Sequence, residues 1–388
     1  MTSNPSQRAR IRDVIPQLRL GKWPTGKLNS ITDVPGVLVH TESIRDGQEV
    51  NTGLTTILFR KDWYKSSCFA GFFSFNGCGE MTATHWMNET GLLTSPIILT
   101  STGSVGDCFK GIHEHCCKYH ANEGGELDLF IFPCVAETFD GYLSNLSKFP
   151  ITTQHVTRGI QNASADRVPE GGTGGGTGMI CHRVKGGTGS SSRTIQGFDV
   201  KGDSKTYTVG VLVQANYGSA ENLHIGGIPV GSILKSQAAD QTPEIEIKEP
   251  RKDGSIIIIV ATDVPLLPVQ LQRLAKRATV GLGKVGGYGS NTSGDIFLAF
   301  STAAKIPFQE LSMQMANQAA SNPYTPAAFA VEMSDNDTIT SVFEAVADAT
   351  EEAIYNAMSM GEGMTGFKGR SVDALDLVKV KEIVERRL

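Results

Sequence analysis

The sequence lacks any apolar run that approaches the ~18 residues of a membrane-spanning helix. Its first residues also lack the apolar segment of a secretory signal peptide. The seven cysteines are an odd number, and their scattered spacing is not that of a disulfide framework. Reduced thiols are typical of intracellular proteins, so we expect a cytoplasmic protein with no membrane partner.

An excess of positive charge is also missing. The formal net charge of the 388 residues is −5, which gives no reason to expect a nucleic-acid partner. No internal repeat and no linker divides the chain. We therefore expect residues 1–388 to form one domain.

Glycine, in contrast, is abundant at 43 residues, and short apolar runs alternate with amphipathic segments. Predicted strands cover residues 127–132, 206–215, 255–261 and 296–300. Predicted helices cover residues 104–119, 265–281 and 340–358. Residues 179–184 and 190–196 predict a hairpin with its turn at 185–187. Because strands pair as hairpins as often as they alternate with helices, we predict an α/β or α+β domain with helices over packed sheets.

The stretch 281–302 is the strongest candidate for a reactive site. A glycine-rich loop leads through Ser290, Thr292 and Ser293 to Gly294 and an apolar run. A hydroxyl at the mouth of a core strand, after backbone that can adopt positive φ, can be held against a carbonyl group. A nucleophile needs this geometry, and so does attack on the preceding peptide bond. A simple polar turn entering a strand is the alternative.

Two other polar residues stand beside flexible backbone or a strand end. Glu170 precedes the glycine loop 171–178, where a carboxylate could bind a substrate ammonium group or simply face solvent. The loop is neither a Walker motif nor a clear dinucleotide fingerprint, although it leaves a small-anion-binding protein open. Asn216 ends a predicted strand and could donate to an oxyanion, a contact worth roughly 3–4 kcal/mol, or form an Asx turn.

A cluster of histidines and cysteines raises the question of a metal site. On a helix, His113 and Cys117 would share a face, with His120 three residues after Cys117, but no partner motif supplies further ligands. Surface histidines and buried free thiols account for the pattern, so we predict no metal and no cofactor. His85 is interpreted as a core or interface histidine.

Several long blocks, in order along nearly the whole chain, resemble the self-processing serine aminopeptidases. This family includes L-aminopeptidase/D-amidase/D-esterase and the β-peptidyl aminopeptidases. The stretches that carry the resemblance are PTGKLNSITDVPGV (24–37), NGCGEMTATHW (76–86), GGGTGMICHRVKGGTGSSSR (174–193), VGVLVQANYG (209–218), SIIIIVATDVPLLPVQLQRLAKRA (255–278), SGDIFLAFST (293–302) and FEAVADATEEAIYNAM (343–358).

The resemblance implies a four-layer αββα sandwich, similar to N-terminal-nucleophile hydrolases but differently connected. It also implies self-cleavage between Thr292 and Ser293, into chains 1–292 and 293–388. Ser293 would then be both the new N-terminus and the nucleophile, with Asn216 as an oxyanion donor. Glu170 would anchor the amino group of the substrate.

Further residues follow from the resemblance with less support in the pattern. Ser334 and Asp337 are the expected hydroxyl and carboxylate near the nucleophile, and Trp86 and His182 are assigned to substrate binding. The chain departs from the family at two of these points. Thr292 stands where Gly or Asn is expected, and His182 stands where an aromatic hydroxyl is expected. Ser290 remains a rival nucleophile, because the bond before it also resembles a cleavage site.

The predicted activity is release of N-terminal residues from short peptides, amides or esters with a free amino group, with β-amino acid peptides included as an option. The resemblance implies a homo-oligomer, a tetramer of processed heterodimers. The alternatives are an acyltransferase of related layered fold and a small-anion-binding protein that uses the glycine loop.

Overall fold

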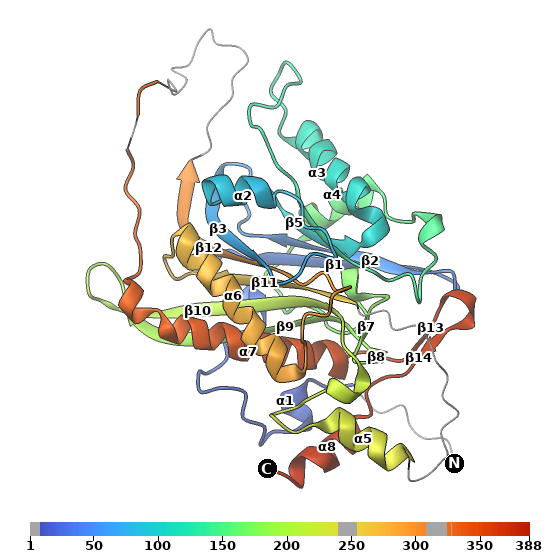
Figure 1. The fold of residues 1–388 in the computed structure, drawn as a ribbon. Coiled ribbons are helices and arrows are strands. Elements are labelled where there is room, and N and C mark those ends of the chain that lie inside the picture. Colours follow the sequence, from blue (N-terminus) through green and yellow to red (C-terminus); the bar gives the residue numbers. More distant parts are fainter. Residues whose placement is uncertain (1–7, 240–253, 308–323, 327) are drawn as a thin grey trace.

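Two β-sheets lie face to face in the computed structural model of the chain, and helices cover the outer face of each sheet (Figure 1). The structure describes residues 8–239, 254–307, 324–326 and 328–388. The order of the layers is helix, sheet, sheet, helix, which confirms the predicted αββα class.

The larger sheet carries the central strands of the fold. Its spatial order is β4 (Leu92–Leu93), β3 (Ser66–Ser74), β12 (Ile296–Pro307), β11 (Ser255–Thr262), β10 (Ser204–Asn216) and β9 (Gly187–Phe198). The smaller sheet has the order β1 (Leu38–Asp46), β2 (Val50–Leu58), β5 (Ile97–Ser101) and β6 (Cys134–Thr138). Two short ribbons pair β7 (Ile180–Cys181) with β8 (Val184–Lys185), and β13 (Met364–Thr365) with β14 (Ser371–Val372).

The long helices form the two outer layers. The helices are α1 (Ile11–Val14), α2 (Thr84–Thr90), α3 (Val105–Tyr119), α4 (Thr153–Asn162), α5 (Val230–Ala239), α6 (Pro268–Val285), α7 (Thr340–Ser359) and α8 (Leu377–Glu385). Helices α6 and α7 pack on the larger sheet, and α3 and α4 pack on the smaller one. None of the helices in the described ranges has the length and apolar character to cross a bilayer.

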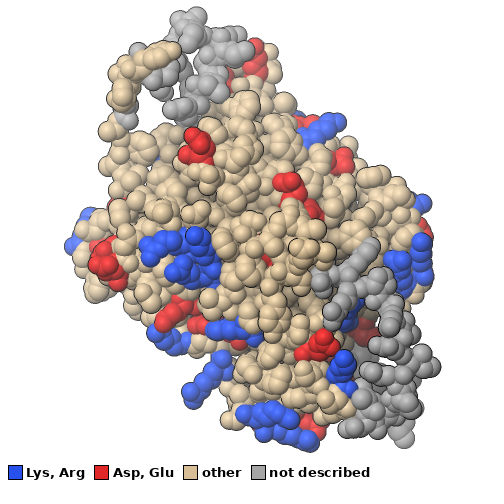
Figure 2. Space-filling model, in the orientation of Figure 1, with Lys and Arg blue, Asp and Glu red and all other residues tan. Residues whose placement is uncertain are grey.

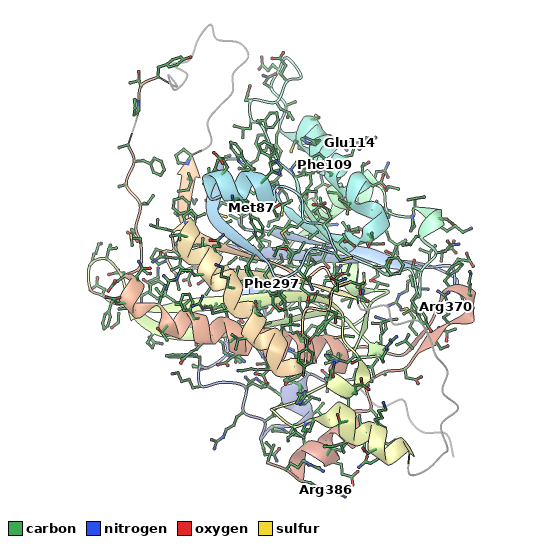
Figure 3. The ribbon with its side chains drawn as sticks, in the orientation of Figure 1. Met87, Phe109, Glu114, Phe297, Arg370 and Arg386 are labelled. Carbon is green, nitrogen blue, oxygen red and sulfur yellow. The ribbon has the colours of Figure 1, made fainter. Side chains whose placement is uncertain are left out.

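Strand β11 shows why the core needs a continuous apolar run. Ile256 and Ile258 point to the helix layer of α6 and α7, whereas Ile257 and Ile259 point to the smaller sheet, and all four are fully buried. A strand covered on both faces has no solvent side, so its sequence does not alternate. Each such side chain contributes about 1.5–3 kcal/mol through burial. Phe297 of β12 lies beside them in the middle of the fold (Figure 3).

Helix α6 joins the parallel strands β11 and β12 and so determines where the reactive loop begins. Pro268 starts the helix, and the side-chain oxygen of Gln270 accepts a hydrogen bond of 2.9 Å from the Leu267 amide. The helix ends at Val285 and is capped by Gly286, whose φ of 107° is left-handed. The chain then turns back and enters β12 through the residues that include Ser293.

Two local predictions are wrong. Residues 127–132 form no strand, because the smaller sheet ends at β6, which pairs with β5 only from Cys134 onward. The apolar residues before it pack outside the sheet instead, where Phe132 stacks on Trp86. The turn predicted at 185–187 lies at His182 and Arg183, between β7 and β8, and β9 begins at Gly187.

On the face that Figure 2 shows, acidic and basic side chains are interspersed.

Candidate active site

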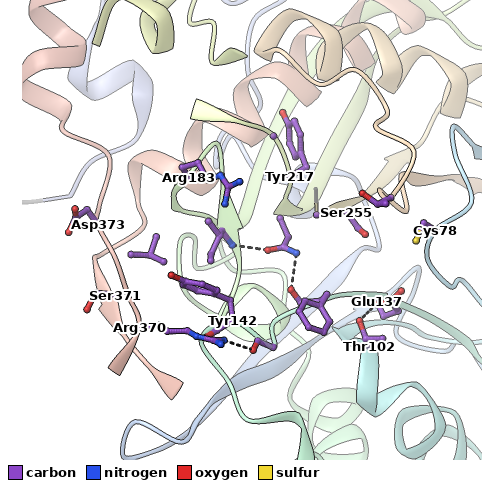
Figure 4. A pocket seen from close by; sticks show the side chains of 18 residues that line it. Cys78, Thr102, Glu137, Tyr142, Arg183, Tyr217, Ser255, Arg370, Ser371 and Asp373 are labelled. Carbon is purple, nitrogen blue, oxygen red and sulfur yellow. Dashed lines mark hydrogen bonds between the residues drawn. The ribbon is translucent and has the colours of Figure 1, made fainter. Parts of the chain in front are cut away.

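A cavity of about 760 Å³ opens where the N-terminal ends of β11 and β12 meet the ends of β6 and β10. This volume is within the usual range for small-molecule sites. Its lining comes from several distant segments (Figure 4): Cys78, Thr102, Glu137, Phe139, Gly141, Tyr142, Ile180, Arg183, Asn216, Tyr217, Gly218, Gly254, Ser255, Thr292, Arg370, Ser371, Val372 and Asp373.

The bond between Thr292 and Ser293 lies at the boundary of this cavity. Thr292 is exposed and lines it, whereas Ser293 is 3% exposed and lines a second cavity of about 140 Å³. A tight turn sets this arrangement, because the Ser293 amide donates a hydrogen bond of 2.8 Å to the Ser290 carbonyl. Ser290 itself lines only the smaller cavity.

The hydroxyl of Ser293 contacts two acceptors. It lies 2.6 Å from Oδ1 of Asp295 and is hydrogen-bonded to the Gly254 carbonyl. A hydroxyl has one proton to donate, so both contacts are hydrogen bonds at once only if Asp295 is protonated and donates in turn. Burial raises the pKa of Asp295 to about 6. Above that pH the ionised carboxylate is placed to take the hydroxyl proton.

Other groups hold Asp295 in this position. The Ile256 amide donates to Oδ1 at 3.1 Å, and the side chain of Asn76 both donates to Oδ2 at 3.3 Å and accepts from the Asp295 amide at 2.6 Å. The sequence analysis missed this carboxylate as a functional group. Its signal is the spacing, because residues i and i+2 of an extended chain point to the same side.

Asn216, the predicted oxyanion donor, lines the same cavity as Thr292. Its Oδ1 accepts from the Ile180 amide at 2.8 Å, and its Nδ2 donates to the Phe139 carbonyl at 2.9 Å. An amide nitrogen has two protons, so within the described residues one N–H of Asn216 is left for a ligand. The side chain is therefore fixed before any substrate arrives.

Glu137, at the end of β6, is a second functional candidate that the sequence analysis missed. It is 5% exposed, and its carboxylate accepts hydrogen bonds from the Glu80 amide at 3.1 Å and from the Thr102 hydroxyl. Burial raises its pKa. A Cβ built on Gly79 would lie 3.0 Å from Cα of Gly294 and 3.3 Å from Oε1 of Glu137, so this carboxylate is close to the nucleophile loop.

Glu170, in contrast, is not at the cavity, and the structure corrects its predicted role. Its side chain is 3% exposed and pairs with Arg10, at 2.7 Å between Oε2 and Nε. It also accepts from the Ser190 amide at 2.8 Å. The carboxylate thus ties the N-terminal segment to β9, and it neither faces solvent nor meets a substrate.

Trp86 and His182 also lie outside both cavities, which corrects their assignment to substrate binding. Trp86 stacks on Phe132 with ring centroids 4.9 Å apart. His182 is 1% exposed, and its Nδ1 is 2.9 Å from the Ser219 carbonyl. Burial lowers its pKa to about 4, so the ring is neutral and serves packing.

Ser334 and Asp337 are at the opposite end of the sheet from Ser293. The Ser334 amide donates to the Pro265 carbonyl at 2.7 Å, beyond the C-terminal end of β11, whereas Ser293 contacts Gly254, before its N-terminal end. The ends of this strand are about 23 Å apart at 3.3 Å per residue. Within one chain, the structure therefore does not bring Ser334 and Asp337 to Ser293.

The histidine and cysteine residues at the C-terminal end of α3 have separate environments. His120 stacks on Tyr64 with ring centroids 4.0 Å apart, and Cys117 is exposed. In the part of the chain that the structure describes, no group of three His, Cys, Asp or Glu side chains is placed to hold a metal ion.

Comparison with known proteins gives consistent matches over most of the chain. A profile of peptidase family S58 matches residues 29–372. The beta-peptidyl aminopeptidase BapA of Sphingosinicella microcystinivorans is 38% identical over 375 residues, which cover 93% of this chain and 89% of that protein. BapA of Sphingosinicella xenopeptidilytica is 36% identical over 376 residues, covering 93% and 88%.

Solved structures agree with these matches. A beta-aminopeptidase of Burkholderia sp. superposes with a TM-score of 0.81 at 38% identity, over 97% of this chain and 99% of that one. The L-aminopeptidase D-Ala-esterase/amidase of Ochrobactrum anthropi, described as a prototype for the serine aminopeptidases and a variant of the Ntn hydrolase fold, gives 0.82 at 36% identity, over 97% and 98%. The chain therefore belongs to peptidase family S58, and it is a serine-type aminopeptidase.

Proposed function

We propose that the chain cuts itself before Ser293 and then uses that residue as an N-terminal nucleophile. The observation that carries this proposal is the buried Ser293 hydroxyl, 2.6 Å from Asp295, with its own preceding peptide bond at the cavity wall. Oγ forms a bond to the Thr292 carbonyl carbon as the C–N bond breaks. The hydroxyl proton passes through Asp295 to the departing amine, and water then hydrolyses the ester.

The same groups act on a substrate once the amine is free. An α-amine has a pKa near ~8, so it can take the Ser293 proton without a histidine. Oγ bonds to the substrate carbonyl carbon as its C–N or C–O bond breaks, and the α-ammonium group passes the Ser293 proton to the departing amine or alcohol. The oxyanion accepts a hydrogen bond from the free N–H of Asn216, and water then hydrolyses the ester to release the acid. Glu137 binds the ammonium group of the substrate, which restricts attack to the first residue of a peptide.

We propose short peptides, amides and esters with a free amino group as substrates. The names of the relatives support β-amino acid residues at the N-terminus as part of this range. A carboxylate close to the nucleophile suits either substrate type, because a β-amino group is only one carbon further from the carbonyl. The cytoplasmic location and the tetramer of processed heterodimers stay predictions from the sequence.

Intact mass and N-terminal sequencing test this function. We expect two chains, the smaller beginning Ser-Gly-Asp-Ile, and release of the first residue from a dipeptide. Ser293→Ala must give one inactive chain, whereas the matched variant Ser290→Ala must be cut as the wild type is. A small chain that begins elsewhere contradicts the proposal. Release of free amine without an acceptor excludes the acyltransferase, and turnover excludes a mere anion-binding protein.

A further inference from the structure

We infer that the side of the cavity opposite Glu137 is a carboxylate-binding subsite formed by Arg183 and Arg370. Figure 4 shows Glu137 with Cys78 and Thr102 on one side of the cavity, and Arg370, Ser371 and Asp373 on the other. The inference rests on the proposed function, because it assigns this side to the part of the peptide beyond the bond that is cut.

A strained turn places Arg183 at the cavity. His182 and Arg183 form the two-residue loop between β7 and β8, with φ of 49° and 66°. Hairpin loops with positive φ at both positions strongly favour Asn and Gly, so this backbone conformation is strained for His182 and Arg183. The backbone contact of 2.7 Å from the His182 amide to the Tyr217 carbonyl holds the turn in place.

The guanidinium group of Arg183 is exposed and unused. In the described part of the chain it makes no hydrogen bond and no ion pair. A planar guanidinium group that faces a cavity suits a carboxylate, which it can bind through two parallel hydrogen bonds.

Arg370 is held more firmly but keeps donors free. It packs over the ring of Tyr142 at 4.9 Å, and its Nη1 donates to the Tyr142 carbonyl at 3.3 Å and the Gly141 carbonyl at 3.5 Å. Within the described residues its Nε and Nη2 have no partner. This packing fixes the group in one position, so little side-chain entropy is lost on binding.

The local charge on this side is positive. Asp373 lines the same side, but among the described residues it forms no ion pair with either arginine. Two guanidinium groups against one carboxylate leave an excess of positive charge, while Glu137 supplies the negative charge opposite. A short peptide with a free C-terminus matches both ends, and an acidic side chain after the scissile bond would present the same chemistry to the arginines.

Kinetics of the processed enzyme test the subsite with three substrates, Ala-Gly, Ala-Gly amide and Ala-Asp amide. We expect kcat/KM for the acid to exceed that for the amide about tenfold, and this ratio to fall at least fivefold in Arg183→Gln. Arg183→Lys should keep part of the ratio. Arg386→Gln, at the end of α8 and far from Arg370 (Figure 3), should change nothing. Faster cleavage of Ala-Asp amide than of Ala-Gly amide would extend the subsite to acidic side chains.

The inference is overturned if acid and amide are cut equally well, or if Arg183→Gln leaves their ratio unchanged. Calorimetric binding of Ala-Gly and its amide to the uncut Ser293→Ala chain separates this result from a failure of the proposed function. The acid must bind more tightly than the amide there too, and the addition of Arg183→Gln must reduce this difference at least fivefold. Equal binding rejects the subsite whether or not the wild type turns over.

Discussion

The hydroxyl of Ser293 and the carboxylate of Asp295 meet at 2.6 Å, on the same side of the chain just before β12. Only one residue separates them, so the contact does not depend on distant packing. Asn76 and the Ile256 amide fix the carboxylate from two further segments. The proposed nucleophile and its proposed proton acceptor are thus already in contact in the uncut chain.

Asp295→Asn should slow self-cleavage by roughly 10²–10⁴-fold, the usual contribution of a positioned base. An amide can still contact the hydroxyl but cannot take its proton. The conversion of intact chain to two chains after cell-free synthesis, followed by mass spectrometry, measures the effect. Asp263→Asn is the matched control, because Asp263 is also a buried carboxylate, hydrogen-bonded to the Thr208 amide at the other end of β11. Equal rates in wild type and Asp295→Asn would exclude this role.

Self-cleavage should also depend on pH. Because the pKa of Asp295 is raised to about 6, the rate should fall about tenfold per unit below pH 6 and level off above pH 7. Asp295→Asn should lose this inflection. The pKa of buried Asp140 is likewise raised to about 6, so Asp140→Asn, which should keep the inflection, is the control.

Acid unfolding through these carboxyl groups does not explain such a profile. Their folded-state pKa values lie above the usual 3.8, so between about pH 4 and 6 the folded chain binds protons more tightly than the unfolded chain. Their contribution to the free energy of unfolding is therefore largest at low pH and decreases as the pH rises through this window. Circular dichroism at each pH checks that the chain stays folded.

Glu137→Gln should lower activity, whereas Glu170→Gln should lower stability. Loss of a charged hydrogen bond of about 1.5–3 kcal/mol should lower kcat/KM for substrates with a free amine by roughly 10–150-fold in Glu137→Gln. Glu170→Gln should instead lower the free energy of unfolding by about 3–5 kcal/mol, because it leaves Arg10 without its buried partner. Steady-state kinetics and denaturant unfolding of both variants decide; a kinetic defect in a fully stable Glu170→Gln would reverse the assignment.

Thiol modification offers a chemical test of the cavity. Cys78 is exposed and lines it, and its amide donates to the Ser293 carbonyl at 3.3 Å. N-Ethylmaleimide should therefore inactivate the processed enzyme, and a dipeptide substrate should protect it. Cys78→Ser should resist the reagent. Cys117→Ser, which removes the exposed thiol of α3, should remain as sensitive as the wild type; inactivation of Cys78→Ser would place the reactive thiol elsewhere.

The local pattern of apolar residues predicts the central strands and helices, but it does not predict which polar side chains contact one another. The strand at 255–261 is predicted by an uninterrupted apolar run, and the helix at 340–358 is predicted by apolar residues at helical spacing. Both patterns can be read directly from the sequence. Residues 127–132 have a similar apolar content, yet they lack a neighbouring strand, and only the fold decides that. The position of Ser293 came from strand-end chemistry together with the family resemblance.

The sequence does not show whether Glu137 or Glu170 lies at the cavity. Glu170 pairs with Arg10, which lies 160 residues earlier in the chain, whereas Glu137 accepts a hydrogen bond from the Glu80 amide and lies near Gly79, next to Gly294. The sequence also does not show how far Ser334 lies from Ser293, because this distance depends on which end of β11 the chain returns to.

Strand β12 lies between β3 and β11 in the interior of the larger sheet, and it is the first element after the proposed cut. Cleavage would therefore yield two polypeptides that share one sheet, with the smaller one hydrogen-bonded on both flanks to the larger. The surfaces at which these two polypeptides meet are buried core surfaces, so neither polypeptide has a complete core alone. Under the proposed cleavage, separately expressed halves would be unable to fold and then dock, so the chain would have to fold first and be cut afterwards.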